Sequence, residues 1–178
     1  MSVTVLLILR NIRLTKGIGV YTLINMDVVD GKRLAGCSKC ACFNLRKASR
    51  VITQMFDKAI KPYGLRGTQF SILAVLAAAG PETISRLSHI LAMDRTTLTR
   101  NLRPMEKSDT IKLARGEDPR SKRVHLTPKG KRIFVNAFPH WEKTQKRVIE
   151  KLGPGRFNAM IGELSDMAEM FSGGETAG

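Results

Sequence analysis

The sequence predicts a mainly α-helical fold with a small β-hairpin wing, a winged helix-turn-helix whose terminal helices form a dimerisation domain. Three observations predict this fold class. Residues 83–107 contain two segments of helical hydrophobic spacing joined by a tight turn. Residues 110–126 contain two short alternating runs on either side of a charged turn. Residues 43–61 and 128–171 carry apolar stripes that a winged unit alone would leave uncovered.

Composition limits the classes of function. The chain has 178 residues, enough for one domain with terminal arms, and a formal net charge of +15. Such an excess of positive charge favours a polyanionic partner, either nucleic acid or an anionic membrane surface. The longest apolar run, Val3–Leu9, is far shorter than the roughly 20 residues that span a bilayer, and it lacks the flanks of a secretory signal. We therefore expect no membrane partner, and three cysteines in an odd cluster, which argue against a disulfide scaffold, indicate the reducing cytoplasm.

Residues 1–36 differ from the rest of the chain because they are rich in Val, Leu, Ile and Thr. Short strands are expected around Val3–Leu9 and Val20–Ile24. Two interpretations are open: an ordered extension packed against the dimer, or a biological start at Met26 with upstream sequence read into the chain. We expect an N-terminal extension that is poorly or variably ordered.

Two helices are expected before the helix-turn-helix. The first, Phe43–Lys61, carries an apolar stripe and ends at Pro62 and Gly64. The second, Gln69–Ala79, is expected to be capped by Thr68. Because this helix is apolar nearly all round, we expect it at the buried centre of the winged domain.

The helix-turn-helix begins at Thr83, and Asp94 is the expected N-cap of its second helix. A carboxylate there meets free backbone N–H groups and the positive end of the helix dipole. With about 100° per residue, one face of this helix is apolar, formed by Leu98, Leu102 and Met105. The opposite face holds hydroxyls and cations: Thr96, Arg100, Arg103 and Lys107. Such a face is often merely solvated, but Glu106 is its only acidic neighbour, which suits a polyanion such as the DNA major groove.

The predicted wing follows directly. Two alternating runs, residues 110–113 and 123–126, flank a turn that contains Gly and Asp-Pro. Three cations are expected near the tip of this hairpin: Arg120, Lys122 and Arg123. A basic helix alone is weak evidence, but a basic helix inside a helix-turn-helix, followed by a basic hairpin, specifically indicates DNA binding.

Two further helices are expected after the wing. Thr127 and Pro128 are typical of a helix start, Pro139 should kink that helix, and Gly153-Pro154 should end it. The last helix has one apolar face, formed by Phe157, Met160, Ile161, Leu164, Met167, Ala168 and Phe171. A symmetric dimer with interleaved terminal helices would cover these faces, and the alternative is a bundle that closes within one chain. The expected organisation is an extension (1–36), a helical dimerisation region (42–64 and 128–171) and a winged helix-turn-helix DNA-binding domain (65–127).

Three segments together resemble the MarR (multiple antibiotic resistance regulator) family. They are Asp94–Leu102 (DRTTLTRNL), Asp118–Val124 (DPRSKRV) and Leu126–Gly130 (LTPKG), and they occur in the family's order. The resemblance extends from about Cys42 to Phe171. It implies a dimeric winged-helix transcriptional regulator.

The chain departs from the family pattern at the end of the second helix. Asp109 and Thr110 stand where the family usually has Gly and Leu. Asp tolerates the left-handed turn that Gly allows, at a cost of about 1 kcal/mol. Pro104 lies inside the helix, removes a backbone donor and should bend the last turn.

Residues near the start of the second helix are the expected base readers, because that end enters the groove in helix-turn-helix docking. They are Arg95, Thr96, Thr97, Thr99 and Arg100. Arg103, further along, is expected to contact phosphate. Arg120 resembles the family's minor-groove arginine, Asp118 resembles the acid that orients it, and Lys122 and Arg123 are expected on the DNA backbone. For each cation the alternative is an exposed charge with no specific contact.

Three cysteines lie close together. Cys37 and Cys40 have zinc-ligand spacing, but a structural site needs four ligands and the histidines lie far along the chain, so we expect no metal. Cys42 opens a helix as in the organic-hydroperoxide-sensing branch of the family, and a helix N-terminus favours thiolate. The tyrosine of that branch is Arg46 here. Sensing through Cys42 and three incidental cysteines therefore both remain open.

The resemblance also implies an effector pocket between the dimer helices and the winged domain, often for aromatic acids. Phe56, Tyr63 and Trp141 are candidates to line it, or plain core residues. No phosphate loop, metal cluster or nucleophile–base pair indicates an enzyme or a cofactor. We predict a sequence-specific repressor that binds a pseudo-palindromic operator in double-stranded DNA as a homodimer. Release would follow binding of an aromatic or peroxide effector, or thiol oxidation. The alternatives are a sequence-blind DNA-packaging protein and a thiol redox protein.

Overall fold

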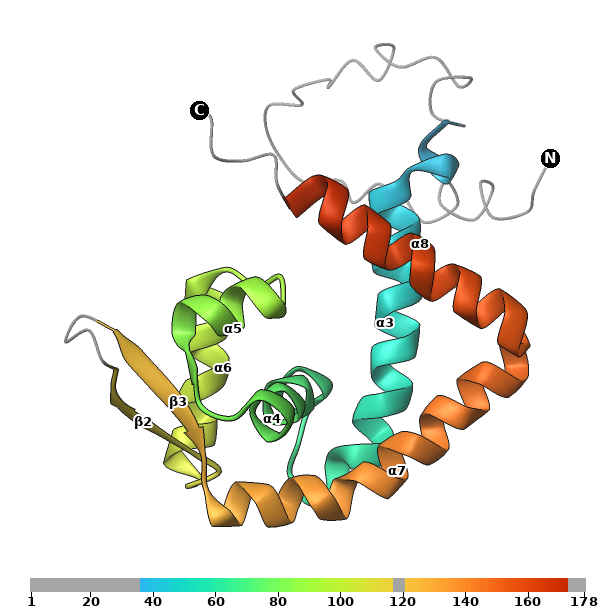
Figure 1. Cartoon of the computed structure of the whole chain (residues 1–178). Helices are drawn as coiled ribbons and strands as arrows, with labels where there is room; N and C mark the ends of the chain where they lie inside the picture. Colours follow the sequence, from blue (N-terminus) through green and yellow to red (C-terminus); the bar gives the residue numbers. More distant parts are fainter. Residues whose placement is uncertain (1–35, 117–120, 173–178) are drawn as a thin grey trace, which may run out of the picture. The chain divides into compact units, whose positions relative to one another are not determined.

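The computed structural model describes residues 36–116 and 121–172. By their contacts, residues 1–44 and 45–178 form two separate units. The elements follow one another in this order: η3 (Cys37–Lys39), α3 (Ala41–Ile60), η4 (Lys61–Tyr63), α4 (Gly67–Ala79), β1 (Glu82–Thr83), α5 (Ile84–Ile90), α6 (Arg95–Lys107), β2 (Ile111–Arg115), β3 (Lys122–Leu126), α7 (Pro128–Leu152) and α8 (Pro154–Ser172) (Figure 1). This order confirms the predicted winged helix-turn-helix. The strands expected around 3–9 and 20–24 lie outside the described residues.

The start of α4 corrects one prediction. Thr68 was expected to cap a helix beginning at Gln69, but α4 begins at Gly67. The Gly67 N–H donates to Asp57 Oδ1, and the Arg66 N–H donates to the side chain of Gln69 at 3.0 Å. Asp57 belongs to α3, so an oxygen from another helix joins the local acceptor Gln69 at the start of α4. The N–H groups at a helix start must find acceptors, but nothing requires those acceptors to be local.

The sheet has three strands in the order β1-β3-β2, and all pairs are antiparallel. Strands β2 and β3 form the predicted hairpin, with Leu113 opposite Val124. Strand β1 was not expected, because two residues are too few to show an alternating pattern. Its Thr83 pairs with Arg123 in the sheet and also caps α5, accepting from the Arg86 N–H at 3.1 Å.

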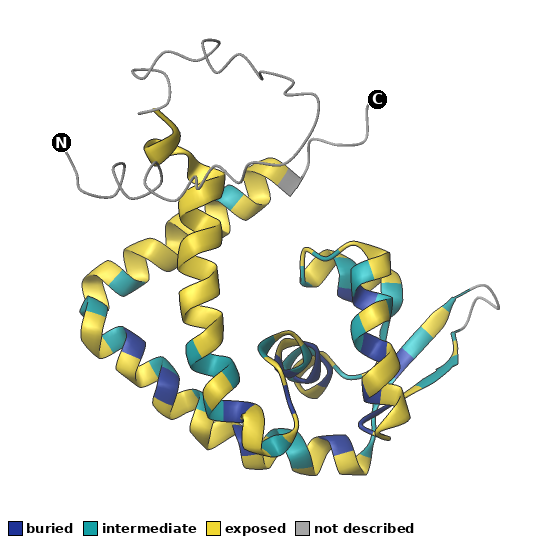
Figure 2. Cartoon of the chain, turned by 180° about the vertical axis from the view of Figure 1, so that it is seen from behind, coloured by how far each residue is buried: buried dark blue, intermediate teal, exposed yellow. Residues whose placement is uncertain are grey.

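The core lies mainly among α4, α5, α6 and the sheet, and Ile60 of α3 and Ala137 of α7 also belong to it; the buried residues are dark in Figure 2. As predicted, α4 contributes heavily, through Phe70, Ile72, Leu73 and Leu76. Leu98 of α6 is fully buried, and truncating a buried Leu to Ala typically costs about 2–5 kcal/mol. The same burial therefore fixes which face of α6 points outward.

Two sequence signals at helix ends behave as predicted. Asp109 has φ 57°, the left-handed turn expected of it, and Gly153 ends α7 with φ 80°. Both α6 and α7 continue past their internal prolines, Pro104 and Pro139. Neither proline interrupts its helix, and the predicted bends remain predictions.

Candidate nucleic-acid interface

The turn between α5 and α6 sets the direction of the second helix. Ala92 has φ 47°, an uncommon conformation for a residue with a Cβ. Hydrogen bonds hold this turn: the Ala92 N–H donates to His89 O at 3.2 Å, and the Met93 N–H donates to Ser88 O at 2.9 Å. The sequence showed no glycine or asparagine at this point that would have indicated the left-handed residue.

Asp94 caps α6 as predicted. Its Oδ1 accepts the Thr97 N–H at 2.8 Å. Hydrogen bonds from Thr97, first from its side chain and then from its backbone, lower the pKa of Asp94 below the ordinary value. The start of α6 therefore carries a stable carboxylate beside a row of cationic and hydroxyl side chains.

The exposed face of α6 holds a surface hollow of about 350 Å³. It is lined by Arg95, Thr96, Thr99, Arg100 and Arg103. The structure thus brings five of the six predicted α6 residues together on one side. Thr97 is the exception: its N–H caps the helix on Asp94, its carbonyl accepts from Asn101 at 2.9 Å, and it is half-buried.

Asn101 ties α6 to α4. Its Nδ2 donates to Thr97 O, and its Oδ1 accepts from the Thr68 hydroxyl at 3.1 Å. Thr68, expected as a helix cap, instead joins two helices 33 residues apart in the chain. No local signal could have predicted this contact.

The predicted wing cations differ in how far they are exposed to solvent. Lys122 is exposed, as a DNA-contacting residue would be. Arg123 is half-buried, and its Nη2 donates to Pro81 O at 3.2 Å, which ties β3 to the segment before β1. Asp118 and Arg120 lie outside the described residues.

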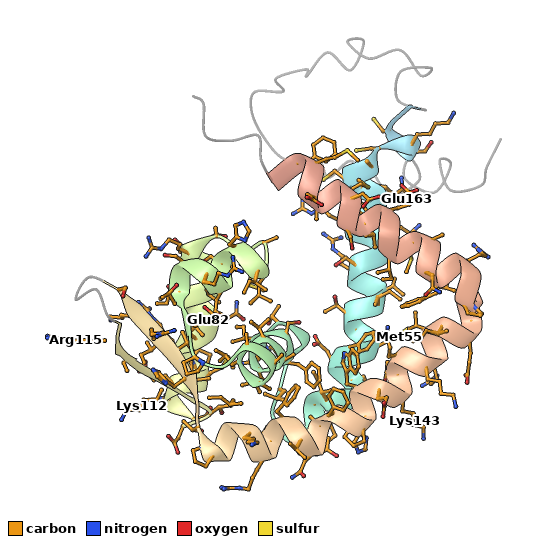
Figure 3. The ribbon with its side chains drawn as sticks, viewed as in Figure 1. Met55, Glu82, Lys112, Arg115, Lys143 and Glu163 are labelled. Atoms are coloured by element: carbon orange, nitrogen blue, oxygen red, sulfur yellow. The ribbon has the colours of Figure 1, made fainter. Side chains whose placement is uncertain are left out.

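Two further wing cations were not singled out from the sequence. Lys112 and Arg115 of β2 are exposed, and Figure 3 shows both side chains leaving the strand for solvent. Arg115 lies opposite Lys122 in the ladder. Like charges facing each other across two strands are destabilising, and an anion bound between them would relieve the repulsion. The strand register, which the sequence did not define, was the missing signal.

A second cavity of about 280 Å³ lies between α3, α4 and α7. Phe56, Phe70 and Trp141 form its aromatic part, and Trp141 stacks on Phe70 with ring centroids 5.7 Å apart. Phe56 and Trp141 were candidates from the sequence. Tyr63, the third candidate, is absent from this lining and packs on His140 at 5.2 Å. The lining also includes Ile52, Thr53, Ile60, Gly67, Thr68, Ser71 and Met93.

The three cysteines are exposed free thiols, and Cys42 lies in the first turn of α3. Among the described residues, no group of three or more His, Cys, Asp or Glu side chains could hold a metal ion. None of the helices in residues 36–116 and 121–172 is long and apolar enough to cross a membrane.

Known proteins similar to this chain are named as transcriptional regulators rather than enzymes. The crystal structure of the Mycobacterium tuberculosis regulator MosR with DNA is 39% identical, and the match covers 74% of this chain and 97% of that one with a TM-score of 0.66. The regulator MgrA of Staphylococcus aureus is 35% identical over 94 residues, which are 52% of this chain and 64% of MgrA. No family model matches the chain.

The curated relatives are matched over about two thirds of their length, 66% and 64% for the first two. A MarR-family regulator from Rhodococcus, at 20% identity and a TM-score of 0.65, shares the fold across 74% of this chain and 94% of its own. The match to MosR covers nearly all of that chain. The chain therefore belongs to the MarR family of winged helix-turn-helix transcriptional regulators.

Proposed function

We propose that this protein is a sequence-specific DNA-binding transcriptional repressor that acts in the cytoplasm, where its operator lies. One observation carries the proposal: the exposed face of α6 gathers three arginines and two threonines around one hollow. Arg pairs with guanine through two hydrogen bonds, and Thr offers a hydroxyl, or a methyl group for thymine. MosR, which is similar to this chain over nearly its whole length, has been crystallised with DNA.

The wing would extend this contact along the DNA backbone. Lys112, Arg115 and Lys122 are exposed on its two strands. Arg103 would contact phosphate from the later part of α6. By resemblance to the family, Arg120 would enter the minor groove and Asp118 would orient it.

A homodimer on a pseudo-palindromic operator follows from the uncovered helices. On α8, Met160, Ile161 and Leu164 each have about two fifths of their surface exposed. Apolar faces of this kind mark interaction sites, and a twofold axis lets the same face cover itself. Two recognition helices would then enter major grooves about 34 Å apart.

Release from DNA would follow one of two routes. The aromatic cavity beside Trp141 suits a small aromatic acid, because it combines stacking surfaces with the hydroxyls of Thr53 and Ser71. The exposed thiol of Cys42 in the first turn of α3 suits oxidation by an organic hydroperoxide. Only the Cys42 route predicts that an organic hydroperoxide releases the protein from DNA.

A gel-shift titration on the DNA upstream of the protein's own gene tests the function. Arg100→Ala should lose about 1–3 kcal/mol of binding on the operator, and the loss should vary with operator sequence. Arg156→Ala removes one positive charge from α8 and is the matched control. Equal losses on every duplex would remove Arg100 from base reading. Equal binding of wild type to unrelated duplexes would instead support a sequence-blind packaging protein.

The same titration with an organic hydroperoxide separates the two routes of release. Loss of binding in wild type but not in Cys42→Ser would identify Cys42 as the sensor. Binding that ignores the oxidant in both proteins would retire the redox route and leave the aromatic cavity as the effector site.

A further inference from the structure

The junction between the end of α6 and the start of α7 is unusually well connected. Helix α6 ends in a Schellman motif: the Asp109 N–H donates to Glu106 O at 2.9 Å, and the Thr110 N–H donates to Met105 O at 2.8 Å. Beyond this motif the chain leaves for β2. The carbonyls of Ser108, Asp109 and Thr110 must then find donors from elsewhere or from water.

Thr127, just before α7, supplies two of these donors. Its hydroxyl lies 2.7 Å from Asp109 O and 3.1 Å from Thr110 O, and its N–H donates to Thr110 O at 3.3 Å. The same hydroxyl oxygen accepts the Gly130 N–H at 2.9 Å and so caps α7. One hydroxyl therefore links the end of one helix to the start of another.

Lys129 supplies the third donor. Its Nζ donates to Ser108 O at 2.7 Å. Because the C-terminal end of a helix carries partial negative charge, an ammonium group is favourable at this position. Lys129 is exposed, so its charge remains solvated while it holds α6.

Gly130 allows the close approach of the two helices. A Cβ on this residue would lie 2.0 Å from Thr110 O, a contact that a backbone atom cannot relieve by turning aside. The glycine is buried at this point. Gly130 lies within α7 and has no left-handed backbone, so its role is to provide space.

We propose that Thr127, Lys129 and Gly130 are positioning residues that join α6 and α7 into one rigid body. This inference rests on the proposed function, because it assumes that α6 reads DNA. The N-terminal half of a recognition helix reaches the bases, so contacts at its C-terminal end help to fix its pose without occupying the face that reads DNA. Helix α7 fixes that end and also brings Trp141 to the aromatic cavity. A shift of α7 would therefore turn α6 in the groove.

Two charge-matched variants test the role of Lys129. Lys129→Met and Lys131→Met each remove one cation from the first turn of α7, but only Lys129 donates to α6. We expect operator affinity to fall roughly two- to tenfold further for Lys129→Met than for Lys131→Met, which is the value of one net hydrogen bond. On an unrelated duplex, both variants should show the same small loss of affinity. Equal operator affinities for the two variants would overturn the positioning role.

A second pair tests Thr127 by rescue. Thr127→Val keeps the side-chain shape but removes the hydroxyl, and Thr127→Ser restores it. We expect Thr127→Val to lower the ratio of operator to unrelated-duplex affinity and to speed amide hydrogen exchange at residues 108–110, and Thr127→Ser to restore both. A parallel loss on all duplexes, tracking only a lower Tm, would show a purely structural residue and overturn the inference. If the wild type binds the operator and the unrelated duplex equally well, the proposed sequence-specific function is wrong. That outcome is distinct from a failure of the positioning role.

Discussion

Asp94 shows how one residue can determine where a helix begins and what its first turn presents. Its carboxylate accepts from Thr97, and that hydrogen bond lowers its pKa. Because the folded-state pKa lies below the unfolded one, the stabilisation is complete above the ordinary pKa of Asp. It is lost as the pH falls through the lowered folded value.

Asp94→Asn should isolate this titration, because Asn is an equally good N-cap without a charge. We expect the difference in Tm between wild type and Asp94→Asn to stay constant at neutral pH. Below about pH 4 the wild type should lose stability relative to the variant, because only the wild type has a carboxylate to protonate. Thermal unfolding across pH measures it. Curves that run parallel down to strongly acidic pH would contradict the assignment.

Arg123 shows the limit of reading single residues from sequence. As a cation beside the wing tip it was expected on the DNA backbone, and this stays a prediction. Its guanidinium also donates to Pro81 O, 42 residues earlier in the chain, a contact that no local pattern indicated. Lys112 and Arg115 are exposed on the same wing and were not predicted. Whether a charge faces DNA depends on the register of the strands, which residue type does not reveal.

Helices with strong local signals were predicted well. The periodic apolar face of α6 and its cap residue both follow from contacts three or four residues apart, and the structure places both as expected. The start of α4 was missed because Asp57, its partner, belongs to another helix. Strand β1 was missed because it exists only by pairing with β3.

The apolar face of helix α8 is the proposed dimer interface. Leu164→Glu should convert a dimer into a monomer, because it would bury an uncompensated charge at the proposed interface. Ala159→Glu adds the same charge on the opposite face of α8 and is the control. Sedimentation equilibrium measures both. A Leu164→Glu protein with the mass of the wild type would remove α8 from the interface.

At the scale of the whole molecule, the net charge of +15 raises affinity for any polyanion. The position of each cation determines whether it contacts a phosphate of the DNA. Removing one cation that binds a phosphate should reduce the slope of log affinity against log salt by about 1. We expect Arg115→Ser to do this and Lys143→Ser, on α7 (Figure 3), to leave the slope nearly unchanged. Affinities measured between about 50 and 200 mM salt test it. Equal slopes would mean that the charge acts only as a diffuse field.

By itself, the sequence determined the order of the main helices and the two wing strands, the cap of α6 and the cationic face beside it, because periodicity and capping act over three or four residues. The tertiary structure alone decided three other features. These are the cap of α4 by Asp57, the link from Thr68 to Asn101, and the junction that joins Thr127 to Asp109. Their partners are 10, 33 and 18 residues apart in the chain. Only packing of the buried faces brings such groups within hydrogen-bonding distance, so no local pattern records them.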